Sequence, residues 1–137
     1  MPFVLDASVA LAWAFAEEDH PTAVAALALI RNDEGCVPSL WWFEVRNVLI
    51  VAERRGRLHE SDTALFLRSL SRLSIAVDRA PEEAAVLTLA RRHGLTVYDA
   101  SYLELAQRHA APLATLDLML AQAAQRENIS LIGHETA

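Results

Sequence analysis

Short apolar runs alternate with longer segments of helical periodicity along the chain. The apolar run at residues 3–5 ends at Asp6, and residues 7–16 are rich in helix formers with apolar side chains four positions apart. The pattern predicts strands over residues 3–5, 35–38, 74–77, 95–98, 112–116 and 129–132. It predicts helices over residues 7–16, 21–32, 39–55, 61–73, 81–94, 99–109 and 117–126.

Residues typical of helix ends stand at several of these boundaries. Asp6 and Ser8 offer capping oxygens to the first helix, and Ser39 offers one at the start of the third. The basic residues 91–93 are followed by Gly94, a combination typical of a helix C-terminus. These signals support the predicted order of elements.

The alternation of strands and helices predicts an α/β protein. Short apolar strands separated by helices favour a mostly parallel central sheet with helices on both faces, a three-layer α/β/α sandwich. The chain has 137 residues without a linker or low-complexity stretch, so we expect a single domain over residues 1–137. In such folds, ligands bind beyond the carboxyl ends of the strands.

Composition narrows the possible chemistry. All 12 basic residues are arginine, and the absence of lysine excludes phosphate-binding P-loops and enzymes that use a Schiff-base lysine. The 4 glycines are too widely spaced to form a dinucleotide-binding turn. A net charge of −6 argues against holding nucleic acid by bulk electrostatics, so a nucleic-acid substrate needs another source of positive charge.

Cysteine usage and the length of the apolar runs bear on location. The single cysteine, Cys36, excludes an internal disulfide, and the chain lacks the paired Cys and His spacings of a structural zinc site. No apolar run approaches the roughly 18 residues that a bilayer span needs. The first residues also lack the basic start of a secretory signal, so we expect a cytoplasmic protein.

Three aspartates stand where a predicted strand turns into a helix, namely Asp6, Asp99 and Asp117. Because the carboxyl ends of parallel strands meet at one edge of a sheet, we expect Asp6 and Asp117 at the same edge. Taken singly, each aspartate is most simply a helix N-cap, a local role worth about 1 kcal/mol.

A fourth carboxylate, Glu44, interrupts a helix that is apolar almost all round. Arg46 and Glu53 mark a narrow solvent stripe on this helix, and at about 100° per residue Glu53 lies opposite Glu44. Glu44 therefore points inward, where an ionised carboxylate without a partner costs several kcal/mol. Two interpretations remain open, a buried ion pair with Arg55 and a functional site.

Two apolar residues of the same helix, Trp42 and Leu49, lie beside the solvent stripe and are expected to be partly exposed. Packing under a neighbouring helix and contact with a partner protein explain them equally well.

Convergence of Asp6, Glu44, Asp99 and Asp117 at the strand ends would create strong repulsion. Two carboxylates about 5 Å apart repel by roughly 3 kcal/mol at an effective dielectric constant near 20. Each helix dipole stabilises a carboxylate at its N-terminus by only about 0.3 to 1 kcal/mol, which is less than the repulsion. Such a cluster must therefore take up protons or bind a cation. An oxygen-only site suits Mg²⁺ or Mn²⁺, and the ion supplies positive charge for a phosphate. The pattern indicates phosphodiester hydrolysis.

Four short motifs contain these carboxylates and together span nearly the whole chain. They are residues 4–8 (VLDAS), 44–49 (EVRNVL), 95–103 (LTVYDASYL) and 113–117 (LATLD). In this order and with this spacing they resemble the PIN-domain ribonucleases, specifically the VapC-type toxins of bacterial toxin–antitoxin pairs. The resemblance implies a PIN-like fold and a Mg²⁺-dependent endoribonuclease, with Mn²⁺ as a possible substitute.

The resemblance also implies roles for individual residues. It assigns the metal site and the catalytic centre to four carboxylates, which are Asp6, Glu44, Asp99 and Asp117. It implies that Thr115 and Ser8 assist these carboxylates, and that Asn47 orients Glu44. It further implies a homodimer and a cognate VapB-like antitoxin that covers the acidic pocket.

The expected reaction is the attack of water on an RNA phosphodiester, with the carboxylates holding the metal. Such an attack predicts 5′-phosphate and 3′-hydroxyl products, and the number of ions, one or two, stays open. Attack by the 2′-hydroxyl would require a pair of positioned histidines, whereas the 5 histidines share no motif and are expected on the surface.

Two other functions remain as alternatives. The first is a PIN-like RNA-processing nuclease that works without an antitoxin. The second is a catalytically silent interaction module whose acidic pocket docks an arginine-rich partner.

Overall fold

Four strands form one parallel sheet in the computed structural model, which describes residues 1–15 and 19–134. The strands are β1 (Phe3–Leu5), β2 (Gly35–Pro38), β3 (Ile75–Asp78) and β4 (Leu113–Ala114). Their order across the sheet is β3-β2-β1-β4, and each neighbouring pair is parallel. Strand β1 therefore lies inside the sheet, between β2 and β4.

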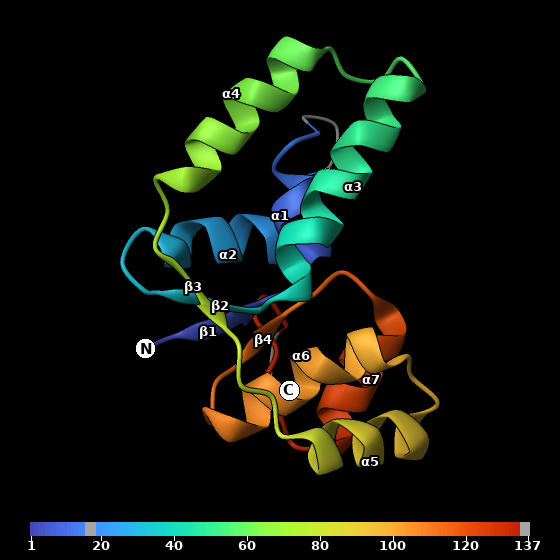
Figure 1. Ribbon diagram of the computed structural model, residues 1–137. Coiled ribbons are helices and arrows are strands. Elements are labelled where there is room, and N and C mark those ends of the chain that lie inside the picture. The colour runs from blue at the N-terminus through green and yellow to red at the C-terminus, as the bar shows by residue number, and fades with distance from the viewer. Residues whose placement is uncertain (16–18, 135–137) are drawn as a thin grey trace.

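Helices cover both faces of this sheet. They are α1 (Ala7–Ala12), α2 (Pro21–Ile30), α3 (Leu40–Arg54), α4 (Glu60–Ser71), α5 (Glu83–His93), α6 (Val97–Arg108) and α7 (Leu118–Arg126). Figure 1 shows α1 to α4 on one side of the sheet and α5 to α7 on the other. The arrangement confirms the predicted three-layer α/β/α sandwich with a parallel sheet.

The burial of the strands explains their composition. Phe3, Val4 and Leu5 of β1 are at most 1% exposed, and β2 and β4 are buried along their whole lengths. Because helices cover both faces, side chains on either side of these strands leave water, so the strands read as continuous apolar runs. The edge strand β3 is only partly buried.

Helices α3 and α4 form a hairpin that extends away from the sheet (Figure 1). The turn contains Gly56 with a φ of 73°, a left-handed conformation that glycine adopts without strain. The Thr63 hydroxyl of α4 donates to Oε2 of Glu53 in α3 at 2.6 Å. Glu53, expected on a solvent stripe, is therefore half-buried between two helices.

The face of α3 that packs inward carries Trp41, Val45, Leu49 and Ala52, and α3 packs against α1. The expectation that Leu49 is partly exposed is wrong, because this side chain is fully buried, whereas Trp42 is 49% exposed. The helical wheel misplaced the solvent face because Glu53, taken as a marker of that face, bonds to Thr63 of α4.

The predicted strand at residues 95–98 is wrong. Thr96 is the N-cap of α6, and its side-chain oxygen accepts a hydrogen bond from the amide of Asp99 at 3.1 Å. A cap at Thr96 thus starts the helix at Val97 and outweighs the apolar, β-branched character of the segment. The strand expected at residues 129–132 is reduced, within the described residues, to one parallel bridge between Leu113 and Leu131.

One predicted helix end and two predicted side-chain caps differ in the structure. Helix α1 ends at Ala12, and residue 16, to which it was expected to extend, lies outside the described residues. Neither Ser39 nor Asp6 caps its helix through the side chain, although both occupy the N-cap position. Ser39 has helical backbone angles, so its hydroxyl does not reach the amides of the first turn.

Charged and polar side chains connect the helices of the layer formed by α5 to α7. Glu127 accepts hydrogen bonds from Arg92 at 2.9 Å and from Gln107 at 2.9 Å, and its Oε2 lies 2.6 Å from Nε2 of His93. The His93 side chain is only 5% exposed, so the expectation that all histidines lie on the surface is wrong.

Within the described residues, no helix has both the length and the apolar character needed to cross a bilayer.

Candidate active site

The carboxyl ends of β1 and β4 bring two of the predicted aspartates to one edge of the sheet. Leu5 pairs with Ala114, so Asp6 and Thr115 leave their strands side by side. The Thr115 hydroxyl donates to Oδ2 of Asp6 at 2.7 Å. Asp117 follows two residues later, and its amide donates to the same Thr115 hydroxyl oxygen at 3.0 Å.

Ser8 completes this polar junction. Its hydroxyl donates to Oδ2 of Asp6 at 2.7 Å, and its oxygen accepts from the amide of Leu116 at 3.0 Å. Ser8 was expected to cap α1, but it instead connects the start of α1 to the turn after β4. The contacts of Ser8 and Thr115 with Asp6 show that both hydroxyls orient this carboxylate.

Asp117 lies at the N-cap of α7, and its Oδ1 accepts from the amide of Leu120 at 3.0 Å. The interpretation of Asp117 as a helix cap is therefore confirmed. The residue is exposed, so capping uses one oxygen and leaves the other accessible to solvent.

Asp99 reaches the site from α6. It lies in the first turn of that helix, where the positive end of the helix dipole favours a carboxylate. It was expected as the N-cap after a strand, but Thr96 holds that position. Asp99 is half-buried.

Glu44 projects from the first half of α3 and is also half-buried. Its Oε1 accepts a hydrogen bond from the Tyr102 hydroxyl at 2.6 Å. Glu44 therefore bonds to Tyr102 and not to Arg55, the ion-pair partner considered from the sequence. Arg55 is the exposed C-cap residue of α3. Asn47 is exposed, and no hydrogen bond joins it to Glu44 within the described residues.

Burial and neighbouring charges shift the pKa values of three of these carboxylates. Burial raises the pKa of Asp6, the hydrogen bonds from Thr115 and Ser8 lower it, and the charge of Asp117 raises it again. Burial raises the pKa of Glu44, the Tyr102 hydrogen bond opposes this increase, and the charges of Asp6 and Asp99 add to it.

The same influences act on Asp99. Burial raises the pKa of Asp99, and the charges of Asp117 and Asp6 raise it further. Asp6, Asp99 and Asp117 thus each raise the pKa of at least one other carboxylate, and Glu44 is affected by two of them, as expected for groups that lie near one another.

The donor chemistry of this cluster fits a hard divalent cation. Its side chains offer only carboxylate and hydroxyl oxygens, which are the ligands that Mg²⁺ and Mn²⁺ prefer. Hydrogen bonds occupy Oδ2 of Asp6, Oε1 of Glu44 and Oδ1 of Asp117, and no side chain among the described residues donates to the second oxygen of each. In the same part of the chain, no three His, Cys, Asp or Glu side chains are already arranged as a metal cage.

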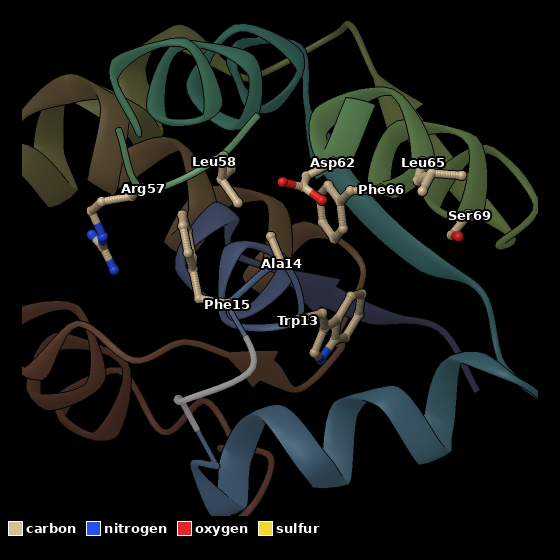
Figure 2. Close-up of a pocket in the computed structure, with 9 residues that line it drawn as sticks. All are labelled: Trp13, Ala14, Phe15, Arg57, Leu58, Asp62, Leu65, Phe66 and Ser69. Atoms are coloured by element: carbon tan, nitrogen blue, oxygen red, sulfur yellow. The ribbon is translucent and has the colours of Figure 1, made fainter. Parts of the chain in front are cut away.

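The larger hollows of the molecule lie away from these carboxylates. One, of about 450 Å³, opens between the end of α1 and α4. Figure 2 shows Trp13 and Phe15 facing Leu58 and Phe66 across it, with the Asp62 carboxylate at its rim. A second, of about 510 Å³, lies at the opposite edge of the sheet beside Met1 and Pro112.

A parallel sheet between two helical layers defines the class of this protein as an α/β/α protein, with Asp6 and Asp117 at the carboxyl ends of β1 and β4. A family model described as the PIN domain matches residues 3–126. The chain therefore belongs to the PIN-domain family.

Similar proteins agree with this assignment. Ribonuclease VapC3 from Pyrobaculum aerophilum is 36% identical over 126 residues, covering 89% of this chain and 94% of the relative. The crystal structure of PAE2754 from the same organism has a TM-score of 0.71 and 26% identity, over 90% of this chain and 84% of that one. A toxin–antitoxin complex from Klebsiella pneumoniae has a similar fold, with a TM-score of 0.61 and 17% identity over 98% and 99% of the two chains. The resemblance to VapC-type PIN domains is confirmed.

Proposed function

We propose that this protein is a Mg²⁺-dependent endoribonuclease that hydrolyses RNA phosphodiester bonds, and that it is the toxin of a type II toxin–antitoxin pair. The observation that carries the proposal is the acidic cluster, in which burial and mutual repulsion raise the pKa values of Asp6, Glu44 and Asp99. The similarity to Ribonuclease VapC3 supports RNA as the substrate.

The four carboxylates Asp6, Glu44, Asp99 and Asp117 would hold the cation. When bound, a divalent ion supplies the positive charge that activates water and stabilises charge developing on the phosphate. Thr115 and Ser8 keep Asp6 oriented, because both hydroxyls donate to the same carboxylate oxygen and leave Oδ1 free of side-chain donors. Attack by water leaves a 5′-phosphate and a 3′-hydroxyl.

An antitoxin related to VapB is the proposed protein partner, and it would cover the acidic pocket. The similar fold found in a Klebsiella pneumoniae toxin–antitoxin complex supports this assignment. The hollow in Figure 2 offers such a partner a second anchoring point. Helix α1 starts beside Asp6 and ends beside this hollow, and its six residues span only about 9 Å, so one antitoxin segment can reach both.

A second copy of the chain is the other proposed partner. The outer face of α3 exposes Trp42 (49%), Phe43 (69%) and Ile50 (41%) next to one another. Exposed apolar side chains gathered on one helix face are typical of an interface. We propose that this face forms the homodimer, and sedimentation of the purified protein measures its oligomeric state.

The test of the proposed function is cleavage of total RNA by the purified protein with Mg²⁺ and with a chelator, followed by analysis of the product ends. We expect cleavage only with the ion, and 5′-phosphate and 3′-hydroxyl ends. Cyclic 2′,3′-phosphate ends, or equal cleavage with the chelator, would contradict the proposal. A small antitoxin gene directly upstream distinguishes the toxin from an RNA-processing nuclease that works without an antitoxin.

A further inference from the structure

Tyr102 is a fully buried residue of α6 that the sequence motifs left without a role beyond packing. Its side chain is 0% exposed, and its hydroxyl donates to Oε1 of Glu44 at 2.6 Å. Tyr102 and Glu44 lie on different helices and 58 positions apart in the chain, so this bond fixes the position of α3 relative to α6 at the acidic cluster.

The phenol also lies near the start of α1, because the backbone of Ala7, the first residue of α1, and the charge of Asp6 both influence the pKa of Tyr102. Ala7 follows Asp6 directly, so the phenol lies near Asp6 as well as Glu44. Its position three residues after Asp99 puts both residues on the same side of α6. The phenol thus touches or neighbours three of the four carboxylates.

The environment keeps this hydroxyl a donor. Burial raises the pKa of Tyr102 far above its usual value, and the nearby charges of Asp6 and Glu44 act in the same direction.

We propose that Tyr102 is a positioning residue, whose hydroxyl holds Oε1 of Glu44 in the acidic cluster so that Oε2 is presented to the divalent cation. The inference rests on the proposed function, since it concerns the same site. Glu44 is half-buried and has three rotatable side-chain bonds, so it needs such a contact to stay turned toward the other carboxylates. Packing of α6 against the sheet requires only the aromatic ring, and phenylalanine supplies the same ring.

The test compares Tyr102→Phe with Tyr98→Phe by calorimetric titration with Mn²⁺ in the absence of RNA. Both variants lose one hydroxyl from the same helix, but Tyr98 is 65% exposed and is a matched control. Loss of a group that orients a metal ligand typically weakens metal affinity by roughly 10- to 100-fold, and we expect this effect for Tyr102→Phe. We expect a change of less than about twofold for Tyr98→Phe.

A double-mutant cycle identifies the route of the effect. If Tyr102 acts through Glu44, Tyr102→Phe should not weaken Mn²⁺ binding further in a Glu44→Ala background. RNA cleavage gives a second readout, with kcat lowered and KM for RNA unchanged, because the hydroxyl is directed at a metal ligand.

Circular dichroism checks that the variants are folded. Should Tyr102→Phe not fold, Tyr102→Met takes its place, because it also removes the hydroxyl, fills the core with an adaptable apolar side chain and leaves Glu44 unchanged.

The outcomes separate this inference from the proposed function. Unchanged Mn²⁺ affinity in Tyr102→Phe, with a wild-type protein that binds the ion, would overturn the positioning role alone. An equal loss of affinity in the Glu44→Ala background would also overturn it. A wild-type protein that binds no Mn²⁺ would overturn the proposed metal site and the positioning role together.

Discussion

The carboxylates at the carboxyl ends of β1 and β4 and those that pair with arginines of α5 and α6 are the same chemical groups in opposite settings. Arg92 donates to Glu127 and Arg108 donates to Asp78, and these contacts lower the pKa of each carboxyl. At the sheet edge, no arginine forms an ion pair with the four acidic residues within the described part of the chain, and burial and repulsion raise the pKa values of Asp6, Glu44 and Asp99 instead.

The comparison distinguishes carboxylates that stabilise the fold from carboxylates that form a candidate binding site. Paired carboxylates connect elements of the fold: Arg108 of α6 contacts Asp78 of β3 at 2.6 Å and Glu104 of its own helix at 2.9 Å. Gathered carboxylates without a basic partner oppose folding until a cation or protons neutralise them. A region that costs stability in the absence of a ligand is a candidate binding site.

The largest expected effect is on catalysis. Asp99→Asn removes one carboxylate of the acidic cluster, and we expect it to lower Mg²⁺-dependent RNA cleavage by more than about 100-fold, beyond what loss of an orienting group costs. Glu83→Gln, an exposed carboxylate in the first turn of α5, is the control and should cleave normally. A cleavage rate of Asp99→Asn equal to that of the control would exclude Asp99 from the site.

The next largest effect is expected on the free energy of unfolding, through the contacts of Arg108 with carboxylates. Arg108→Ala leaves Glu104, whose side chain is 3% exposed, without its charged partner. Removing one member of a buried pair costs about 3 to 5 kcal/mol, and partial exposure of Arg108 reduces our expectation to about 2 kcal/mol. Urea unfolding measures this loss, and Arg91→Ala, an exposed arginine, should change the free energy of unfolding little. Equal stability of the two variants would show that the Arg108 contacts do not support the fold.

A smaller effect of opposite sign is expected at the sheet edge. In metal-free buffer, Asp99→Asn should be more stable than the wild type by roughly 0.5 kcal/mol, because it removes one of several repelling charges from a half-buried position. Thermal unfolding measures the difference. Addition of Mg²⁺ should reverse the order, since only the wild type gains the full binding energy. Lower stability of the variant without metal would indicate that repulsion is not the dominant influence on Asp99.

The smallest effect is the pH dependence of that difference. The pKa of Asp99 is raised in the folded protein above its usual value of 3.8, so the destabilisation is present near neutral pH and is relieved as pH falls through the raised pKa. We expect the stability difference between Asp99→Asn and the metal-free wild type to shrink on acidification. Asp78 and Glu127 have lowered pKa values, so their contribution is lost only as pH falls further. A constant difference across this range would contradict the assigned direction.

Sequence alone predicted the parts of the site that depend on local order. Asp6 and Asp117 each follow an apolar strand and open a helix, and parallel strands bring such positions together by rule. Glu44 was recognised because a carboxylate on an apolar helix is conspicuous. Residues 95–98 were misassigned because apolar, β-branched residues suit both a strand and the start of a helix, and the Thr96 cap decides between them.

The partners of the carboxylates were harder to predict. Tyr102 has an ordinary place in the core pattern of α6, and its bond to Glu44 depends on how α3 and α6 pack across the sheet. Arg55 was considered as a partner from the same helix and the resemblance implied Asn47, whereas the donor to Glu44 comes from another helix. His93 was expected on the surface because it ends a helix, but Glu127 at the end of α7 buries it.

The most direct test of the central claim is a crystal structure of the protein soaked with Mn²⁺, in which anomalous scattering locates the ion. The proposal predicts an anomalous peak coordinated by oxygens of Asp6, Glu44, Asp99 and Asp117. No peak at the carboxyl edge of β1 and β4 at saturating Mn²⁺, or a peak bound only by other residues, would contradict it.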